Sequence, residues 1–158
     1  MVRPRGQKEK LGDIVKNNRG FSLLELLIVV AIILIIATIA LPSFLRSRQS
    51  ANEAAAVAAL RLTNTAEVTY ASSSGAGKYG ALTDLFAAGL LDSRFSTTMQ
   101  GYNFVVTLAS NQMDYTITAT AMASNAGRYD FYTAPDYVIR YSSLTSRAPS
   151  GLAGEPVR

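Results

Sequence analysis

One acidic side chain interrupts the longest apolar run in this chain of 158 residues. The run extends from Phe21 to Leu41, and Glu25 is the one charged residue in it. At a helical rise of about 1.5 Å per residue the run would be roughly 31 Å long, which matches a bilayer hydrocarbon core of about 30 Å. A carboxylate in such a span costs roughly 2.5 to 3.5 kcal/mol on insertion scales. Glu25 therefore either attracts a cation within the membrane or reaches the headgroups from near one end of the span.

Few other residues have side chains suited to catalysis or metal binding. The chain has no His and no Cys, which excludes imidazole bases, thiolate nucleophiles, disulfides and the commonest zinc ligands. Asp114, Asp130 and Asp136 would bind calcium if the fold brought them to one strand edge, but the spacing is not that of an EF-hand loop. Solvated turn residues are the favoured interpretation of these aspartates, and Lys78 and Arg128 are interpreted as surface charges. The sequence thus predicts no catalytic residue, no metal and no cofactor.

Basic residues precede the apolar run. Residues 1–20 contain six basic residues and two acidic ones, which gives a net charge of 6 minus 2, or +4. The basic residues are Arg3, Arg5, Lys8, Lys10, Lys16 and Arg19, and the acidic ones are Glu9 and Asp13. Basic flanks stay in the cytoplasm, so we expect the N-terminus inside and residues 43–158 outside the cytoplasmic membrane. The first twenty residues carry the whole formal charge of +4. The basic balance is therefore no indication of nucleic-acid binding.

The stretch RGFSLLE at residues 19–25, followed by the apolar run to Leu41-Pro42, resembles the prepilin signature of type IV pilins and the related type II secretion pseudopilins. The resemblance covers about the first quarter of the chain. It implies that prepilin peptidase, a membrane aspartyl peptidase, cuts after Gly20 and that the new N-terminal Phe21 is N-methylated. The alternative is ordinary secretory cleavage after Thr38-Ile39-Ala40, but such signals have an apolar core of only about 7 to 15 residues.

The resemblance also implies a partner for Glu25, which in the family pairs with the N-terminal amine of a neighbouring subunit during assembly. Breaking one side of a buried ion pair costs about 3 to 5 kcal/mol, which is enough to decide whether a subunit joins a filament. Pro42 should kink or end the helical hydrogen bonding around residues 38–41. Many family members have glycine at the position of Leu34, and Leu favours helix over Gly by about 0.8 to 1 kcal/mol, so unwinding should be shorter or confined to the proline.

A second stretch with helical period follows at residues 44–72. Its expected buried stripe is mainly alanine: Ala51, Ala55, Ala58, Leu62, Ala66 and Thr69. Its expected exposed residues are Arg48, Asn52, Glu53 and Arg61. The helix should stop at SSSGAGKYG, residues 72–80, where Ser and Gly favour turns.

The rest of the chain predicts a sheet and one short helix. The stretch at residues 81–92 should contain that helix, with Thr83 as its N-cap and Gly89 ending or weakening it. Alternating apolar and polar residues predict antiparallel strands at 102–109 and 114–122, joined through residues 110–113. A second hairpin is expected from residues 129–133 and 137–142 around an Ala-Pro-Asp turn, and residues 143–158 form a tail that packs partly along the sheet edge. The tyrosines in this region are expected to be half buried: Tyr70, Tyr79, Tyr129, Tyr132 and Tyr141.

These elements predict an α+β fold like that of the type IV pilins, in which a long N-terminal helix packs on an antiparallel sheet of about four strands. Residues 1–20 would be the leader, residues 21–44 the transmembrane and assembly half of the helix, and residues 45–158 one globular head domain. With no cysteine to close the C-terminal loop, packing and hydrogen bonds must hold the tail.

The leading functional hypothesis is a structural subunit of a type IV pilus without catalysis. The precursor would lie in the bacterial inner membrane with its head domain extracytoplasmic. Prepilin peptidase would cut it, and the pilus assembly machinery would polymerise it with copies of itself into a helical filament at the cell surface. One alternative is a major pseudopilin of a type II secretion system, a short piston rather than a surface fibre. The other is a membrane-tethered extracytoplasmic binding domain whose N-terminal match is accidental.

Overall fold

The computed structural model describes residues 20–96, 98–141 and 154–157. Contacts within the chain divide it into two compact units, Met1–Ile39 and Ala40–Arg158. The long helix α1, Leu23–Ser72, begins in the first unit and ends in the second. The remaining elements belong to the second unit: α2 at Leu82–Ala87, a short 3-10 helix at Ser93–Ser96, and five strands.

Helix α1 contains two kinds of sequence. Its first part is rich in Leu, Ile and Val, and although β-branched residues favour strands in water, a helix satisfies every backbone group internally in hydrocarbon. Its later part is rich in alanine, the strongest helix former. The helix ends at Ser72, as predicted, and two glycine N–H groups in the following loop bond its last turns. Gly75 donates to the carbonyl of Tyr70 at 2.7 Å and Gly77 donates to the carbonyl of Ala71 at 2.8 Å.

The buried face of α1 differs from the predicted stripe. Of the predicted residues, Ala66 is buried and Ala55 is partly buried, whereas the others are exposed: Ala51, Ala58, Leu62 and Thr69. The buried face instead contains Glu53, Ala56, Val57, Ala59, Leu60, Thr63, Asn64, Ala66 and Glu67. The prediction was wrong because alanines lie all around this part of the helix and select no face. The larger Val57 and Leu60, together with polar side chains that find partners in the head, decide which face is covered.

Helix α2 has a different start from the one predicted. Its N-cap is Ala81, and Thr83 lies inside the helix. The carboxylate of Asp84 accepts the backbone N–H of Ala81 at 2.9 Å and so takes the capping role expected of Thr83. Gly89 ends the helix as predicted, with φ of +68°, a backbone conformation that glycine adopts without strain.

The sheet is an antiparallel meander in the order β1-β2-β3-β4-β5. Its strands are β1 Tyr102–Leu108, β2 Tyr115–Ala121, β3 Phe131–Thr133, β4 Arg140–Tyr141 and β5 Glu155–Pro156. The two predicted hairpins are confirmed, with Phe104 opposite Ala119 in the first and Tyr132 opposite Arg140 in the second. The sheet has five strands rather than four because the tail returns to pair with β4. Residues 143–153 and 158 of the predicted tail, and residue 142 of the predicted last strand, lie outside the described residues.

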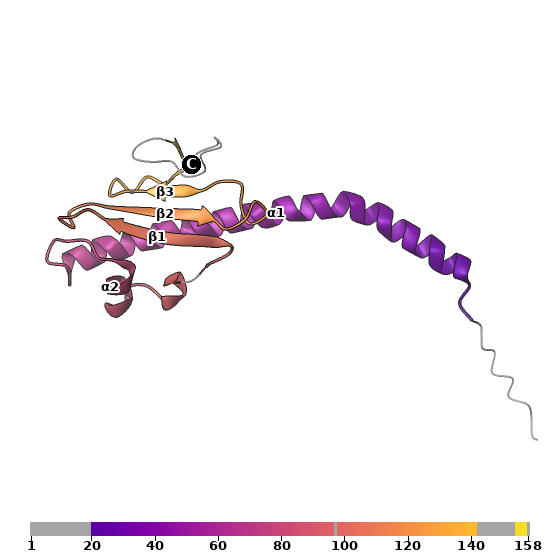
Figure 1. Ribbon diagram of the computed structural model, residues 1–158, viewed down its shortest axis with the longest axis horizontal. Helices are drawn as coiled ribbons and strands as arrows, with labels where there is room; N and C mark the ends of the chain where they lie inside the picture. The colour runs from indigo at the N-terminus through magenta and orange to yellow at the C-terminus, as the bar shows by residue number, and fades with distance from the viewer. Residues whose placement is uncertain (1–19, 97, 142–153, 158) are drawn as a thin grey trace, which may run out of the picture. The chain divides into compact units, whose positions relative to one another are not determined.

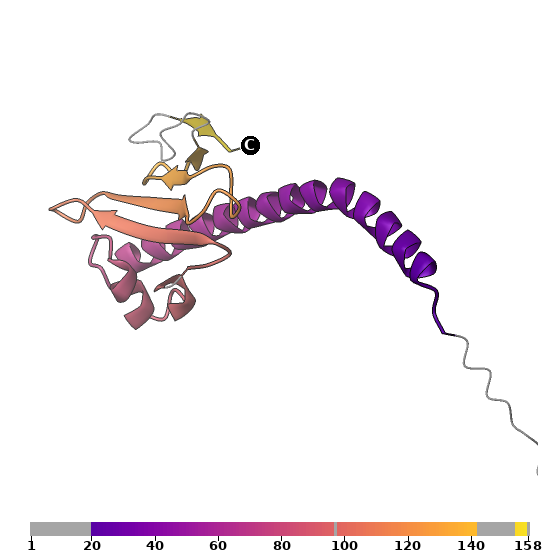
Figure 2. The same cartoon turned by 45° about the vertical axis from the view of Figure 1, so that its right-hand side comes forward.

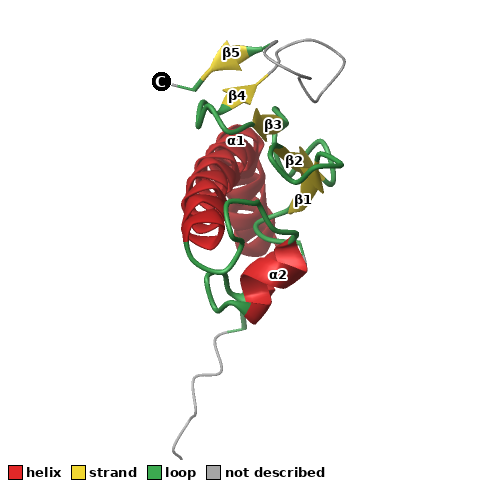
Figure 3. Ribbon diagram, turned by 90° about the vertical axis from the view of Figure 1, so that its left-hand side faces the viewer, coloured by secondary structure: helices red, strands yellow, loops and turns green. Residues whose placement is uncertain are grey.

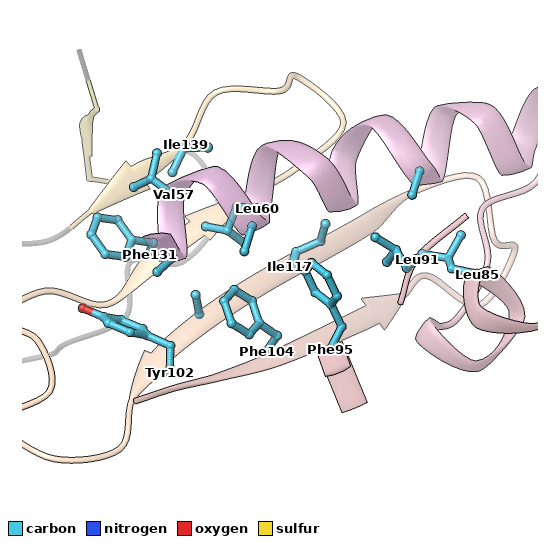
Figure 4. Close-up of a cluster of buried hydrophobic side chains, with 14 of the residues drawn as sticks. Val57, Leu60, Leu85, Leu91, Phe95, Tyr102, Phe104, Ile117, Phe131 and Ile139 are labelled. Carbon is cyan, nitrogen blue, oxygen red and sulfur yellow. The ribbon is translucent and has the colours of Figure 1, made fainter. Parts of the chain in front are cut away.

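The core of the second unit lies between the sheet and the later part of α1. Strands β1 to β3 run along this part of the helix in two views, and the end-on view shows the sheet on one side of it (Figures 1, 2 and 3). Leu60 from α1 meets Phe104 and Ile117 from the sheet in the cluster of Figure 4. Burying each such side chain contributes about 1.5 to 3 kcal/mol. Alternate side chains of β1 and β2 lie in this core, and the threonines lie on the other face together with the exposed Val105.

Tyr102 shows how closely the edge of this core is packed. Its hydroxyl donates to the carbonyl of Tyr129 at 2.7 Å and passes directly over Gly127. A side chain at position 127 would occupy the same space as this hydroxyl, so the loop before β3 requires glycine there.

Candidate assembly and anchoring segment

Gly20 and Phe21 lie directly before α1 and are open to approach. Phe21 is 73% exposed, and nothing lies within 4 Å of the position that a Cβ at residue 20 would occupy. The peptide bond between these residues, where the resemblance implies cleavage, is therefore not covered by the described part of the chain.

Ser22 and Glu25 form a capping box at the start of α1. The Ser22 hydroxyl oxygen accepts the N–H of Leu24 at 3.3 Å, and Oε2 of Glu25 accepts the N–H of Ser22 at 3.2 Å. The two side chains thus satisfy two of the backbone donors that a helix start leaves unpaired. The sequence analysis missed this role, although a serine followed three residues later by a glutamate before an apolar run is its signal.

The capping box leaves part of the Glu25 carboxylate free. Only Oε2 is used, and Oε1 makes no hydrogen bond to another described residue. The positive end of the helix dipole also favours a carboxylate in the first turn. Glu25 can therefore stabilise its own helix and still offer one oxygen to a cation from outside the subunit.

The apolar part of α1 is not covered by any other part of the chain that the structure describes. Between Phe21 and Leu45 every residue is exposed except Ala37, which is partly exposed. Among the described residues α1 is the one helix long and apolar enough to cross a membrane, and its most apolar stretch is entirely unburied. Apolar surface of this extent requires lipid or other subunits to cover it.

Pro42 lies inside α1 and does not end it, contrary to one of the two outcomes predicted. Proline removes one backbone donor, so the carbonyl of Thr38 loses its usual partner four residues later. Side-chain bonds continue along this stretch. The Thr38 hydroxyl donates to the carbonyl of Ile35 at 2.7 Å, and the Ser47 hydroxyl donates to the carbonyl of Ser43 at 3.0 Å.

Polar residues of α1 hold the loop before β3. Nε2 of Gln49 donates to the carbonyl of Ser124 at 2.7 Å, and Nδ2 of Asn52 donates to the carbonyl of Ala126 at 2.8 Å. Glu53 accepts the backbone N–H of Arg128 at 2.7 Å and forms an ion pair with its guanidinium at 3.0 Å. The prediction that Glu53 points away from the core was therefore wrong, whereas Arg128 is exposed as predicted but paired with Glu53. The hydrogen bonds and charge of Glu53 raise the pKa of Arg128.

A second polar group is buried further along α1. Asn64 donates to the hydroxyl of Thr133 at 2.9 Å and accepts from the hydroxyl of Tyr115 at 3.0 Å. Glu67 is fully buried, and its Oε2 accepts the N–H of Gly80 at 3.0 Å, while its Oε1 has no partner. Burial raises the pKa of Glu67 to about 7. Nothing in the sequence distinguishes these residues from solvated ones, because their partners lie far away along the chain.

The three aspartates considered for calcium each have a protein partner. Asp114 accepts the N–H of Tyr115 at 2.8 Å, and Asp136 forms an ion pair with Arg140, whose hydrogen bond lowers the pKa of Asp136. Asp130 is buried and accepts the N–H of Ala121 at 2.8 Å, so it is not the solvated turn residue that was expected. The part of the chain that the structure describes contains no group of three or more His, Cys, Asp or Glu side chains able to hold a metal ion.

Four of the five tyrosines are half buried, as predicted, and Tyr132 is more deeply buried than predicted. The half-buried four are Tyr70, Tyr79, Tyr129 and Tyr141. Tyr129 and Tyr141 lie with ring centroids 4.9 Å apart, and the Tyr141 hydroxyl donates to Glu155 at 3.0 Å.

Comparison with protein-family models finds one match, to the prokaryotic N-terminal methylation motif, at residues 15–41. No curated protein and no solved structure matches the chain. The matched motif is the prepilin signature of type IV pilins, and it includes the bond between Gly20 and Phe21, the capping box and the apolar run described above. Together with a long helix packed on an antiparallel sheet, the motif indicates a type IV pilin-like protein, a class that includes pilus subunits and pseudopilins.

Proposed function

We propose that this protein is the structural subunit of a type IV pilus. The observation that carries the proposal is the prepilin motif at residues 15–41, which falls on an apolar helix that no other described residue covers. The precursor is held in the inner membrane with its N-terminus in the cytoplasm and its head domain outside. Prepilin peptidase cuts after Gly20, and Phe21 becomes the methylated N-terminus. The subunit has a structural role and no catalytic one.

Assembly uses the new amine and Glu25. In the membrane, Oε1 of Glu25 accepts a hydrogen bond from the N-terminal ammonium group of Phe21 in a neighbouring copy. Its Oε2 continues to accept the N–H of Ser22 at the start of α1. Pro42 lies near the outer end of the apolar run, where its missing donor weakens the helix during packing into the filament. Burial of the apolar run among neighbouring copies then replaces its contacts with lipid.

The first test concerns the mature N-terminus. We expect a chain that begins at Phe21 and carries one methyl group on its amine, because the basic leader ends at Gly20. Mass spectrometry of the protein recovered from the producing cells measures both features. A mature chain that begins at Leu41 would support ordinary signal cleavage and contradict the pilin interpretation.

A second measurement distinguishes a pilus from a secretion pseudopilus, which would use the same segment. Electron microscopy of fibres sheared from the cells, with mass spectrometry of their main component, should show long fibres composed chiefly of this chain. Cells without such fibres, in which the processed chain stays in the envelope and supports protein secretion, would favour the major pseudopilin.

A further inference from the structure

Four exposed basic side chains in the described part of the chain contact no acid. The three other described cations form ion pairs: Arg94 with Asp92, Arg128 with Glu53, and Arg140 with Asp136. No hydrogen bond or ion pair with another described residue is present for the remaining four, which are Arg46, Arg48, Arg61 and Lys78. Any counter-ion of these four cations must therefore come from outside the described part of their own subunit. Without such a counter-ion they are solvated by water.

The described carboxylates are in the opposite situation, because each of them already accepts a hydrogen bond within the chain. They are Glu25, Glu53, Glu67, Asp84, Asp92, Asp114, Asp130, Asp136 and Glu155. A second copy of the chain offers the same carboxylates, and a carboxylate that accepts one hydrogen bond, such as Glu25 through Oε2, still has acceptor sites for a cation. The position of the unpaired cations along α1 therefore decides between a carboxylate of another copy and an anion that does not belong to this protein.

The position of Arg46 and Arg48 along α1, just after the apolar run, identifies this counter-ion. They follow Phe44 and Leu45, the last large apolar side chains that α1 leaves exposed before its buried face begins, and both arginines are exposed themselves. Arg46 lies five positions after Leu41, about 7 to 8 Å further along a helix. Arg48 lies about 10 to 11 Å beyond Leu41 by the same rise. The headgroup layer extends about 5 to 7 Å beyond each side of the hydrocarbon core, so for a span that ends at Leu41 both backbone positions lie at or beyond its outer edge, and the long arginine side chains reach back to the lipid phosphates.

We propose that Arg46 and Arg48 bind phospholipid phosphates on the face of the membrane opposite the leader, and so hold the base of the head domain at the bilayer surface. The planar guanidinium donates two parallel hydrogen bonds to a phosphate, which suits arginine better than lysine for this contact. The two residues are two positions apart, so they point to different sides of α1 and contact different lipids. The inference rests on the proposed function in one respect, that the apolar helix is in a bilayer.

The contact is measurable with the full-length chain reconstituted in bilayers of phosphatidylcholine and phosphatidylglycerol. Magnetic dephasing of arginine ¹⁵N signals by lipid ³¹P in solid-state NMR reports guanidinium groups that touch phosphate. The buffer contains no phosphate, so lipid is its only source. The variants are R46Q/R48Q and, as a matched control, R61Q, which removes another exposed and unpaired arginine of α1. The chain has eleven arginines, and those of the leader contribute equally in every sample.

We expect the dephased share of the arginine signal to fall in R46Q/R48Q by up to two elevenths, because this variant removes two of the eleven arginines. In R61Q the dephased share should stay at the wild-type level, after correction for the removed residue. Amide exchange of residues 21–41, measured in the same samples, reports insertion. A protected helix with no loss of dephasing in R46Q/R48Q overturns the phosphate contacts alone. A helix that exchanges freely overturns the membrane-anchored subunit itself, and this inference with it.

Discussion

At the scale of single residues, Glu25 has one observed role, in the cap of its own helix, and one proposed role, in assembly. In its own chain it accepts the backbone N–H of Ser22, a contact typically worth about 1 kcal/mol to a helix start. In the proposed assembly its charge attracts the amine of the neighbouring subunit, and this attraction does not depend on the hydrogen bond to Ser22. Glutamine serves the cap as well as glutamate does but carries no charge, so substitution can distinguish the two functions.

Replacing Glu25 by Gln should abolish fibres while leaving processing intact. Insertion should be unaffected or easier because a charge is removed from the span, but the attraction to the Phe21 amine is lost. Cleaved subunits should accumulate in the inner membrane, as measured by immunoblotting of membrane and sheared-fibre fractions. Ser22→Ala is the matched control, since it weakens the cap and keeps the charge, and it should still form fibres. Wild-type fibre yield from Glu25→Gln would show that the charge serves only its own subunit.

At the scale of elements, the orientation of α1 about its own axis depends on which side chains fit the sheet. Leu60 is fully buried, whereas Leu62, two positions later, is 51% exposed. Both are leucines in the same helical stretch, and the hydrophobic pattern alone favoured Leu62 as the buried one.

This difference predicts unequal effects of truncation. Leu60→Ala should lower the free energy of unfolding by about 2 to 5 kcal/mol because it leaves a cavity in the core. Leu62→Ala should change it by no more than about 0.5 kcal/mol. Chemical unfolding of the full chain in mild detergent, followed by the loss of tertiary signal from the buried tyrosines, measures both. Equal losses in the two variants would contradict the observed orientation of α1.

Glu67 connects α1 with the loop that follows it. The loop provides Gly80 as its hydrogen-bond donor, and the Asp84 carboxylate of α2 adds to the rise in the pKa of Glu67 that burial causes. Tyr79 and Tyr115 also lie within the electrostatic reach of Glu67. The pKa of Glu67 is about 7 in the folded chain and 4.5 in the reference state, so the folded state holds the proton more tightly.

The stability of the head should therefore fall as pH rises. The folded state binds more protons than the unfolded state between pH 4.5 and about 7, and across this window Glu67 should remove up to about 3 kcal/mol from the free energy of unfolding. The loss is complete above the folded pKa. Glu67→Gln should flatten the profile, whereas Asp92→Asn, at an exposed acid, should leave it unchanged. Denaturant titrations at several pH values measure these profiles, and a wild-type slope in Glu67→Gln would exclude Glu67 as the cause.

At the scale of the whole molecule, folding and assembly use different parts of the chain. The core lies within the unit Ala40–Arg158, and the uncovered apolar surface lies before it. The boundaries at residues 1–20, 21–44 and 45–158 remain predictions, since the division after Ile39 reflects contacts rather than processing. After removal of the leader, nine basic residues balance nine acids, so net charge does not keep mature copies apart.

A fragment of residues 45–158 should consequently be soluble and monomeric. The buried face of α1 and the sheet cover each other within one copy, whereas the residues that we propose for association are missing. Analytical ultracentrifugation and electron microscopy of the purified fragment in plain buffer test this. Regular filaments of the fragment would show that residues 21–44 do not drive polymerisation.

The sequence alone determined the features whose causes are local. Glycine and serine after Ser72 end α1, Gly89 ends α2, and alternating side chains define β1 and β2, because each depends on backbone preferences or on one covered face. The prepilin motif is equally local, since a peptidase recognises neighbouring residues. The capping box was present in the same stretch and was overlooked.

Only the tertiary structure decided which face of α1 is buried and which polar residues it carries. Glu53, Asn64 and Glu67 are covered because Arg128, Thr133 and Gly80 meet them from distant parts of the chain. The fifth strand has the same kind of cause, since Val157 donates to the carbonyl of Ile139 at 2.8 Å only after the tail has returned to the sheet. Hydropathy treats a polar side chain as solvated wherever it stands. A buried hydrogen bond offsets that preference, and its partner is chosen by the fold rather than by neighbours in sequence.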